Sequence, residues 1–220
     1  MANPEIHDLN RDLEVLLPGE LSYADAFDRQ RRLHAERVAG ERGDTLVLLT
    51  HPKVVTMGRG SHAENLLRTP EELVADGFEI HETDRGGDVT YHGPGQLVGY
   101  PIVDLRPLGL GPRDYLRRLE GSLIDLLGTY GVEGRREEGL TGVWTDAGKV
   151  AAIGIRISRG VTMHGFALNV TTALTDFDVI VPCGIHDRAV ARLADLVDED
   201  VTVDSVAKRY PACLARALAR

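Results

Sequence analysis

The sequence predicts an α+β fold with a mixed, largely antiparallel sheet flanked by helices. Three strand-like runs, at 141–145, 150–157 and 161–170, are separated only by short turns, which is typical of an antiparallel meander. Helical spacing of apolar residues is found in 23–39 and 112–130. Strand and helix patterns do not alternate regularly along the chain, and this argues against a doubly wound parallel sheet.

Other strands are expected from short apolar or alternating runs. One such run, 13–17, should end at Pro18 and Gly19, because both residues interrupt strands. Further β-rich runs lie at 45–50, 54–57, 78–82 and 96–103. The charged stretch 133–138 is expected to be exposed, and residues 146–149 read as a turn.

The predicted helices carry recognisable end signals. Ser22 and Gly40 bracket the first helix, and Thr69-Pro70 starts a short one. Gly111-Pro112 opens the leucine-rich helix. Helical spacing returns after Arg188, where Pro211 is expected to break or kink the last helix.

Composition limits the class of protein. A chain of 220 residues with 43% hydrophobic residues suits one domain, 1–220. We find no apolar run near the ~20 residues that span a bilayer, and the first ten residues lack the apolar centre of a signal peptide. Cys183 and Cys213 do not form a disulfide framework. These features suit a cytoplasmic protein, and the net charge of −9 argues against nucleic acid as a partner.

The most unusual stretch is 85–101, which reads RGGDVTYHGPGQLVGYP. Four glycines and a proline lie between Arg85 and Gly95, a density that neither an ordinary helix nor a plain strand needs. It matches neither a Walker loop nor the dinucleotide fingerprint. We interpret it as a binding loop rather than a simple tight turn, because it also carries the polar side chains of Thr90, Tyr91, His92 and Gln96.

Cys183 lies between a proline and a glycine, which favours a sharp loop. Many buried cysteines are only small core residues, and we expect that role for Cys213. A cysteine nucleophile needs its thiolate, yet a thiol with the ordinary pKa of about 8.5 is mostly protonated at neutral pH. A basic or cationic partner is therefore required, and the candidates are Lys149, His92, His164 and His186.

Three blocks together resemble the lipoyl(octanoyl)transferase family. The first is RGGxxTxHGPGQ at 85–96, the second is KVAAIGIR at 149–156 with HGFALN at 164–169, and the third is PCGI at 182–185. The resemblance covers 45–187 well. It implies a biotin/lipoate-ligase-like fold and an acyltransferase, octanoyl-acyl carrier protein:protein N-octanoyltransferase, acting in protein lipoylation.

The resemblance also implies roles for individual residues. Cys183 becomes the acylated nucleophile and Lys149 its partner, either as a neutral base or as a cation that holds the thiolate. Small residues near an eight-carbon chain would let pocket depth select chain length, at about 0.8 kcal/mol per buried methylene. The implied substrate-binding residues are Arg85, Gly86, Gly87, Asp88, Val89, Thr90, Tyr91, His92, Ala152, Ile153, Gly154, Gly165, Phe166 and Ala167.

The implied partners are octanoyl-acyl carrier protein as donor and, as acceptors, the lipoyl domains of 2-oxoacid dehydrogenases and glycine cleavage proteins. No cofactor, metal, ATP or membrane is expected. Because acyl carrier proteins are acidic, docking on this acidic chain would need a local basic patch. Two predicted helices carry clustered arginines, which are otherwise solvated helix faces: Arg29, Arg31, Arg32 and Arg37, and Arg113, Arg117 and Arg118.

Three other functions remain open at this stage. An ATP-dependent lipoate or biotin-type ligase of the same fold would activate a free acid without a cysteine nucleophile. A non-catalytic acyl- or lipoyl-binding protein would need neither Cys183 nor Lys149 for chemistry. A Cys-His hydrolase using His92 would release free octanoate. The loop around Cys183 favours the transferase.

Overall fold

The computed structural model describes residues 13–181 and 189–219. These residues form a seven-stranded sheet, in the order β1-β2-β6-β10-β9-β8-β7, and a three-stranded sheet, β4-β3-β5. The large sheet consists of β1 (Glu14–Glu20), β2 (Thr45–Thr50), β6 (Gln96–Ile102), β7 (Arg135–Glu137), β8 (Leu140–Thr145), β9 (Gly148–Ser158) and β10 (Val161–Asn169). The small sheet consists of β3 (Val54–Met57), β4 (Glu79–Glu82) and β5 (Val89–His92).

The sheets are mixed and mainly antiparallel. The pairs β1–β2 and β3–β4 are parallel, and all other named strand pairs in the described part of the chain are antiparallel. The predicted meander is present as β8, β9 and β10. The predicted α+β class is therefore confirmed.

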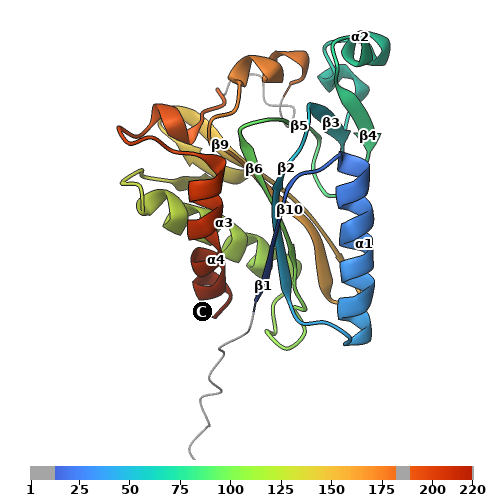
Figure 1. The fold of residues 1–220 in the computed structure, drawn as a ribbon, viewed down its shortest axis with the longest axis vertical. Helices are drawn as coiled ribbons and strands as arrows, with labels where there is room; N and C mark the ends of the chain where they lie inside the picture. The colour runs from blue at the N-terminus through green and yellow to red at the C-terminus, as the bar shows by residue number, and fades with distance from the viewer. Residues whose placement is uncertain (1–12, 182–188, 220) are drawn as a thin grey trace, which may run out of the picture.

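Helices cover both faces of the large sheet. Helix α1 (Tyr23–Ala39) lies on one side, and α3 (Pro112–Gly128) and α4 (Val203–Ala219) lie together on the other (Figure 1). The short α2 (Pro70–Ala75) packs against β4 of the small sheet. No helix of the described residues is long and apolar enough to cross a membrane.

The end signals of the first two helices act as predicted. The Ser22 side chain accepts a hydrogen bond from the Asp25 backbone N–H at 3.1 Å, and Gly40 ends α1 in the left-handed conformation. Thr69 and Glu72 form a reciprocal capping box at α2. These local bonds satisfy backbone groups that the helix ends would otherwise leave without partners.

Strands β9 and β10 place small residues on one face and large residues on the other. Ala152 is opposite Ala167, and Gly154 is opposite Gly165. The intervening side chains pack with α3 and α4 in the main core; they are Ala151, Ile153, Phe166 and Leu168. Since side chains alternate along a strand, the opposite face carries only hydrogen atoms and methyl groups at these four small residues. All four residues line the pocket described below.

The predicted end of the first strand was wrong, and Pro211 does not break the last helix. Strand β1 continues through Pro18 and Gly19 to Glu20, with a change of register between Leu16 and Gly19. An edge strand tolerates proline, because its outer N–H groups need no partner in the sheet. Pro211 lies inside α4, which continues on both sides of it.

Four further expectations differ from the structure. The glycine-rich loop contains a strand, β5, and the charged stretch 133–138 contains β7. Lys149 lies in β9 rather than in a turn. After residue 188 the α-helix begins only at Val203. Strand β5 pairs with β3, which is distant in the sequence, so a local pattern cannot reveal it. Strand β7 pairs with its neighbour β8.

Candidate active site

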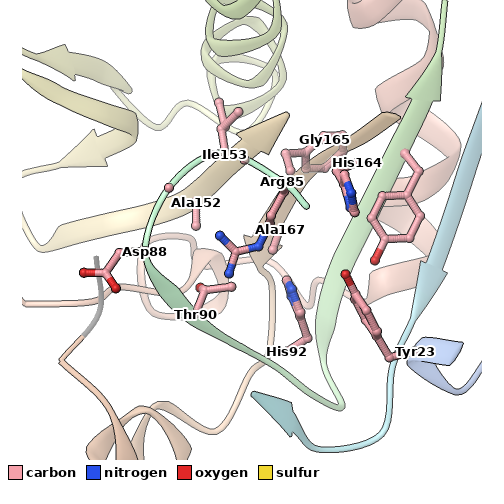
Figure 2. A pocket seen from close by; sticks show the side chains of 14 residues that line it. Tyr23, Arg85, Asp88, Thr90, His92, Ala152, Ile153, His164, Gly165 and Ala167 are labelled. Carbon is pink, nitrogen blue, oxygen red and sulfur yellow. The ribbon is translucent and has the colours of Figure 1, made fainter. Parts of the chain in front are cut away.

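A pocket lies where the two sheets meet, beneath the N-terminal end of α1. Figure 2 shows Thr90 and His92 on one side, Ala152, Gly165 and Ala167 on the sheet, and Tyr23 at one end. The lining residues are Tyr23, Arg85, Gly87, Asp88, Thr90, His92, Tyr100, Ala152, Ile153, Gly154, His164, Gly165, Phe166 and Ala167. The glycine-rich loop and the small-residue face of the sheet therefore enclose one space.

Arg85 supplies a buried positive charge to this pocket, with 7% of its surface exposed. Its Nη2 donates to the Thr56 carbonyl at 2.7 Å and to Thr56 Oγ1 at 2.9 Å, and its Nη1 donates to the Gly86 carbonyl at 3.2 Å. These contacts fix the guanidinium at the wall of the pocket. Close packing also needs glycine at position 58, because a Cβ there would lie 2.3 Å from the Gly87 carbonyl oxygen.

Strand β5 divides the predicted loop residues between two environments. Asp88, Thr90 and His92 line the pocket. Val89 and Tyr91 point to the opposite face, into the core of the small sheet. The Tyr91 hydroxyl donates to Asp176 at 2.8 Å, and burial raises the pKa of this phenol. The period-2 alternation of a strand explains the division.

The backbone of the loop is held against β9. The Gly86 N–H donates to the Ile155 carbonyl at 2.9 Å, so Gly86 contributes an anchor outside the set of lining residues. Ile153 lines the pocket with its backbone region, whereas its side chain points toward the α3 side (Figure 2). The side chains that face the pocket from this sheet are therefore those of the alanines, with the glycines between them, rather than that of Ile153.

Two buried histidines beside the pocket are neutral. Burial, together with the neighbouring His51, lowers the pKa of His92 to about 3. Burial also lowers the pKa of His51 to about 4. His51 Nδ1 is 2.8 Å from the Leu21 carbonyl, so it carries the proton, and Nε2 accepts from the Tyr100 hydroxyl at 2.8 Å. Neither ring adds a second cation beside Arg85 at neutral pH.

His164 occupies an unusual backbone position in β10. Its φ is 56°, in the left-handed region that few non-glycine residues adopt. Its N–H donates to Gln30 Oε1 and its Nε2 is close to Asp84 Oδ1, each at 2.8 Å. Burial lowers the pKa of His164, although Asp84 opposes the shift. Such strain, held by contacts from α1, is common at functional sites.

Lys149 lies in a second cavity that adjoins the first. The two cavities share Thr90, Ala152 and Ala167 as lining residues. Lys149 is only 7% exposed, and its Nζ is 5.3 Å from the centre of the Trp144 ring. Gly142 permits this packing, because a Cβ there would lie 2.7 Å from Lys149 Cε. The lysine is therefore buried in a cavity that shares three wall residues with the first.

The candidate partners of Cys183 lie in different places. His92 and His164 line the first cavity, and Lys149 lines the second. His186 and the loop 182–185, with Cys183, lie outside the described residues. Phe177 and Val190, which precede and follow that gap, both line the Lys149 cavity.

Sequence reasoning missed several residues of the site. Thr56 holds Arg85, and Tyr23 and Tyr100 line the pocket. Tyr23 begins α1, within the predicted helix 23–39, whose apolar spacing does not indicate a pocket residue. The run 54–57 is predicted as a strand, and nothing in it marks Thr56 as a site residue.

Comparisons with known proteins show the family of this chain. The family model for the lipoyl protein ligase A/B catalytic domain matches residues 22–215. An octanoyltransferase of Acidobacterium capsulatum is 52% identical over 201 residues, which cover 85% of this chain and 82% of that one. The chain belongs to the octanoyltransferases of the lipoyl protein ligase A/B family. Another family member, from Chloroflexus aurantiacus, is 47% identical over 95% of both chains.

The fold is shared with ligases at much lower sequence identity. A lipoate-protein ligase A bound with ATP superposes with a TM-score of 0.70 at 18% identity, covering 93% of this chain and 83% of that one. A biotin protein ligase of Aquifex aeolicus gives 0.52 at 14% identity, covering 93% and 68%. These similarities confirm the predicted biotin/lipoate-ligase-like fold.

Proposed function

We propose that this octanoyltransferase moves an octanoyl group from acyl carrier protein to the lysine of a lipoyl domain through a thioester on Cys183. Octanoyl transfer in protein lipoylation follows from the identity of 47–52% with octanoyltransferases over most of the chain. The covalent intermediate, the partner role of Lys149 and the individual acceptor domains are the parts that we add. The acceptors we expect are lipoyl domains of 2-oxoacid dehydrogenases and glycine cleavage proteins.

The observation that carries the mechanism is the burial of Lys149 at the end of a small-residue pocket. Lysine is among the side chains least often buried, so its burial beside an apolar cavity supports a role there. Cys183 follows Phe177 by six residues and precedes Val190 by seven, and both of these line the Lys149 cavity. This placement supports a Lys149–Cys183 pair with the acyl chain lying over Ala152 and Ala167.

The first step forms the acyl-enzyme. The Cys183 thiolate attacks the carbonyl carbon of the donor thioester, a new C–S bond forms, and the C–S bond to the carrier breaks. The carrier thiolate leaves and takes up a proton. One thioester replaces another, so the step is close to balance and needs no ATP.

The second step transfers the acyl group to nitrogen. The neutral ε-amine of the acceptor lysine attacks the acyl-enzyme, an amide C–N bond forms, and the Cys183 thiolate leaves. The attacking amine loses a proton, and we assign Lys149 as the group that takes it up. Amide formation from a thioester is downhill, and this drives the overall transfer.

The proposal is tested by the mass of an acceptor lipoyl domain after incubation with octanoyl-acyl carrier protein and enzyme, without ATP. We expect one added octanoyl group, and its loss in Cys183→Ala and in the uncharged Lys149→Met. Cys213→Ala is the matched control, since Cys213 is buried in α4 away from both cavities. Transfer that requires ATP would indicate a ligase, and transfer by Cys183→Ala would refute the thioester.

A further inference from the structure

Two polar side chains of the sequence blocks, Gln96 and Asn169, have no role in the chemistry above. Gln96 begins β6 and Asn169 ends β10, and the two face each other across the antiparallel pair. Both line the Lys149 cavity and are buried, with 1% and 4% of their surfaces exposed. Buried amides are retained where their hydrogen bonds specify an arrangement.

Only one assignment of donors and acceptors is consistent with all the hydrogen bonds of these two amides. Asn169 Nδ2 donates to the Ala191 carbonyl at 3.0 Å, and a carbonyl can only accept. Asn169 Oδ1 therefore faces Gln96 and accepts from Gln96 Nε2 at 2.9 Å. The same Nε2 also donates to the Tyr91 carbonyl at 3.2 Å. Gln96 Oε1 is thus the atom that lies 2.9 Å from His92 Nδ1.

This direction determines the tautomer of His92. Gln96 Oε1 only accepts, so His92 Nδ1 must carry the ring proton. The ring is neutral because it is buried, and its other nitrogen, Nε2, therefore holds a lone pair. Figure 2 shows the imidazole pointing into the pocket, between Thr90 and Tyr23 and toward Arg85.

The other end of the chain of hydrogen bonds reaches the backbone beside Lys149. The Lys149 N–H donates to the Ala189 carbonyl, and the Ala191 N–H donates to the Lys149 carbonyl, each at 2.9 Å. Ala191 is also the residue whose carbonyl Asn169 holds. One continuous series of bonds therefore joins the wall of the acyl pocket to the segment 189–191.

We infer that Gln96 and Asn169 are positioning residues that hold His92 as its Nδ1–H tautomer and tie the acyl pocket to the segment 189–191 beside Lys149. The inference deepens the proposed function, on which its catalytic consequence rests. The tautomer itself is a property of the free protein. It is therefore measurable whether or not the proposed acyl transfer is correct.

The first test is long-range ¹H–¹⁵N NMR of the free protein labelled at histidine, between pH 5 and 8. We expect a protonated Nδ1 and an unprotonated Nε2 for His92 throughout this range. In Gln96→Met, which has no acceptor for Nδ1, the pure Nδ1–H signature should be lost. Gln96→Glu, which keeps an acceptor but cannot donate to Asn169 Oδ1 or the Tyr91 carbonyl, should keep Nδ1 protonated. An Nε2–H tautomer in the native sequence, or an unchanged signature in Gln96→Met, would overturn the inference.

The second test separates the two ends of this series of hydrogen bonds, His92 and Ala191. Asn169→Asp still accepts from Gln96 but cannot donate to the Ala191 carbonyl. We expect His92 to keep its tautomer while hydrogen exchange of the Ala191 amide becomes at least tenfold faster. Ser122→Ala, which loses a buried bond to Tyr210 between α3 and α4, is the control for general destabilisation. Equal exchange at Ala191 in the two variants would refute the link to 189–191.

The catalytic consequence is measured as kcat/KM for octanoyl transfer at temperatures where all variants are folded. The kcat/KM of Gln96→Met should be at least tenfold below that of the native enzyme, and the kcat/KM of Gln96→Glu should lie between the two. Ser122→Ala should retain the native kcat/KM. A loss in Gln96→Met no greater than in Ser122→Ala would contradict the positioning role. The tautomer is measured without substrate. A negative NMR result would therefore refute the positioning role of Gln96 without bearing on the proposed acyl transfer.

Discussion

Ala152→Val should shorten the acyl chain that the enzyme prefers. Ala152 lies on the small-residue face of β9, opposite Ala167, and lines both cavities. Valine adds two carbon atoms on that face and suits a strand. If these atoms occupy the space of two methylenes, octanoyl loses about 1.6 kcal/mol of burial relative to hexanoyl, at about 0.8 kcal/mol for each. The preference for octanoyl over hexanoyl should then fall by about 15-fold, since 1.4 kcal/mol is tenfold.

The assay compares the rates of acyl-enzyme formation from hexanoyl- and octanoyl-acyl carrier protein by intact mass. Ile157→Val is the control, because Ile157 lies on β9 beyond the pocket and packs against the main core. It should change stability slightly and leave the chain-length ratio unaltered. An unchanged ratio in a folded Ala152→Val protein would refute the placement of the acyl chain over this face.

Three further predictions concern stability. First, the unfolded chain binds protons at His51 and His92 near pH 6.5, whereas their pKa values in the fold are about 4 and about 3. The free energy of unfolding should therefore fall as pH drops below 6.5, by up to about 1.4 kcal/mol per pH unit for each ring. Urea titrations from pH 7 to 5 should show this slope, and His92→Gln should reduce it; an unaltered slope would contradict the assignment. Second, Gly165→Ala should cost about 1–3 kcal/mol, because its Cβ would lie 2.2 Å from the Gly99 carbonyl oxygen. Gly128→Ala, in open space at the end of α3, should instead stabilise by about 0.5–1 kcal/mol, and equal effects of the two in thermal unfolding would refute the reasoning. Third, Thr56→Val should cost about 1.5–3 kcal/mol in urea unfolding, because the buried Arg85 loses a hydroxyl acceptor, and a neutral result would show that the Thr56 carbonyl suffices.

Local signals predicted the helices and the meander well. The Ser22 cap, the Thr69 capping box and Gly40 act within a few residues, so the sequence next to them contains the information. The same holds for β8, β9 and β10, which are joined by short turns. The family resemblance is confirmed, and it identified most of the pocket wall without any distance information.

Long-range pairing was not readable from the sequence. Strand β3 looks like a continuation of β2, yet it pairs with β4 and β5 in a separate sheet. Lys149 reads as a turn lysine, and its burial depends on β8 and on the segment at Ala189. Arg37 was grouped with candidate docking arginines, but its guanidinium is largely buried and pairs with Asp44 at 2.8 Å and Asp104 at 3.6 Å. Each of these outcomes depends on residues that are far apart in the chain.

The most direct test of the central claim is the intact mass of the enzyme itself after mixing with octanoyl-acyl carrier protein, without ATP and without an acceptor domain. The mechanism predicts one added octanoyl group on the native protein and on Cys213→Ala, and none on Cys183→Ala. It also predicts that hydroxylamine, which cleaves thioesters, removes the group. An adduct that persists in Cys183→Ala, or no adduct on any of the three proteins, would contradict the covalent mechanism.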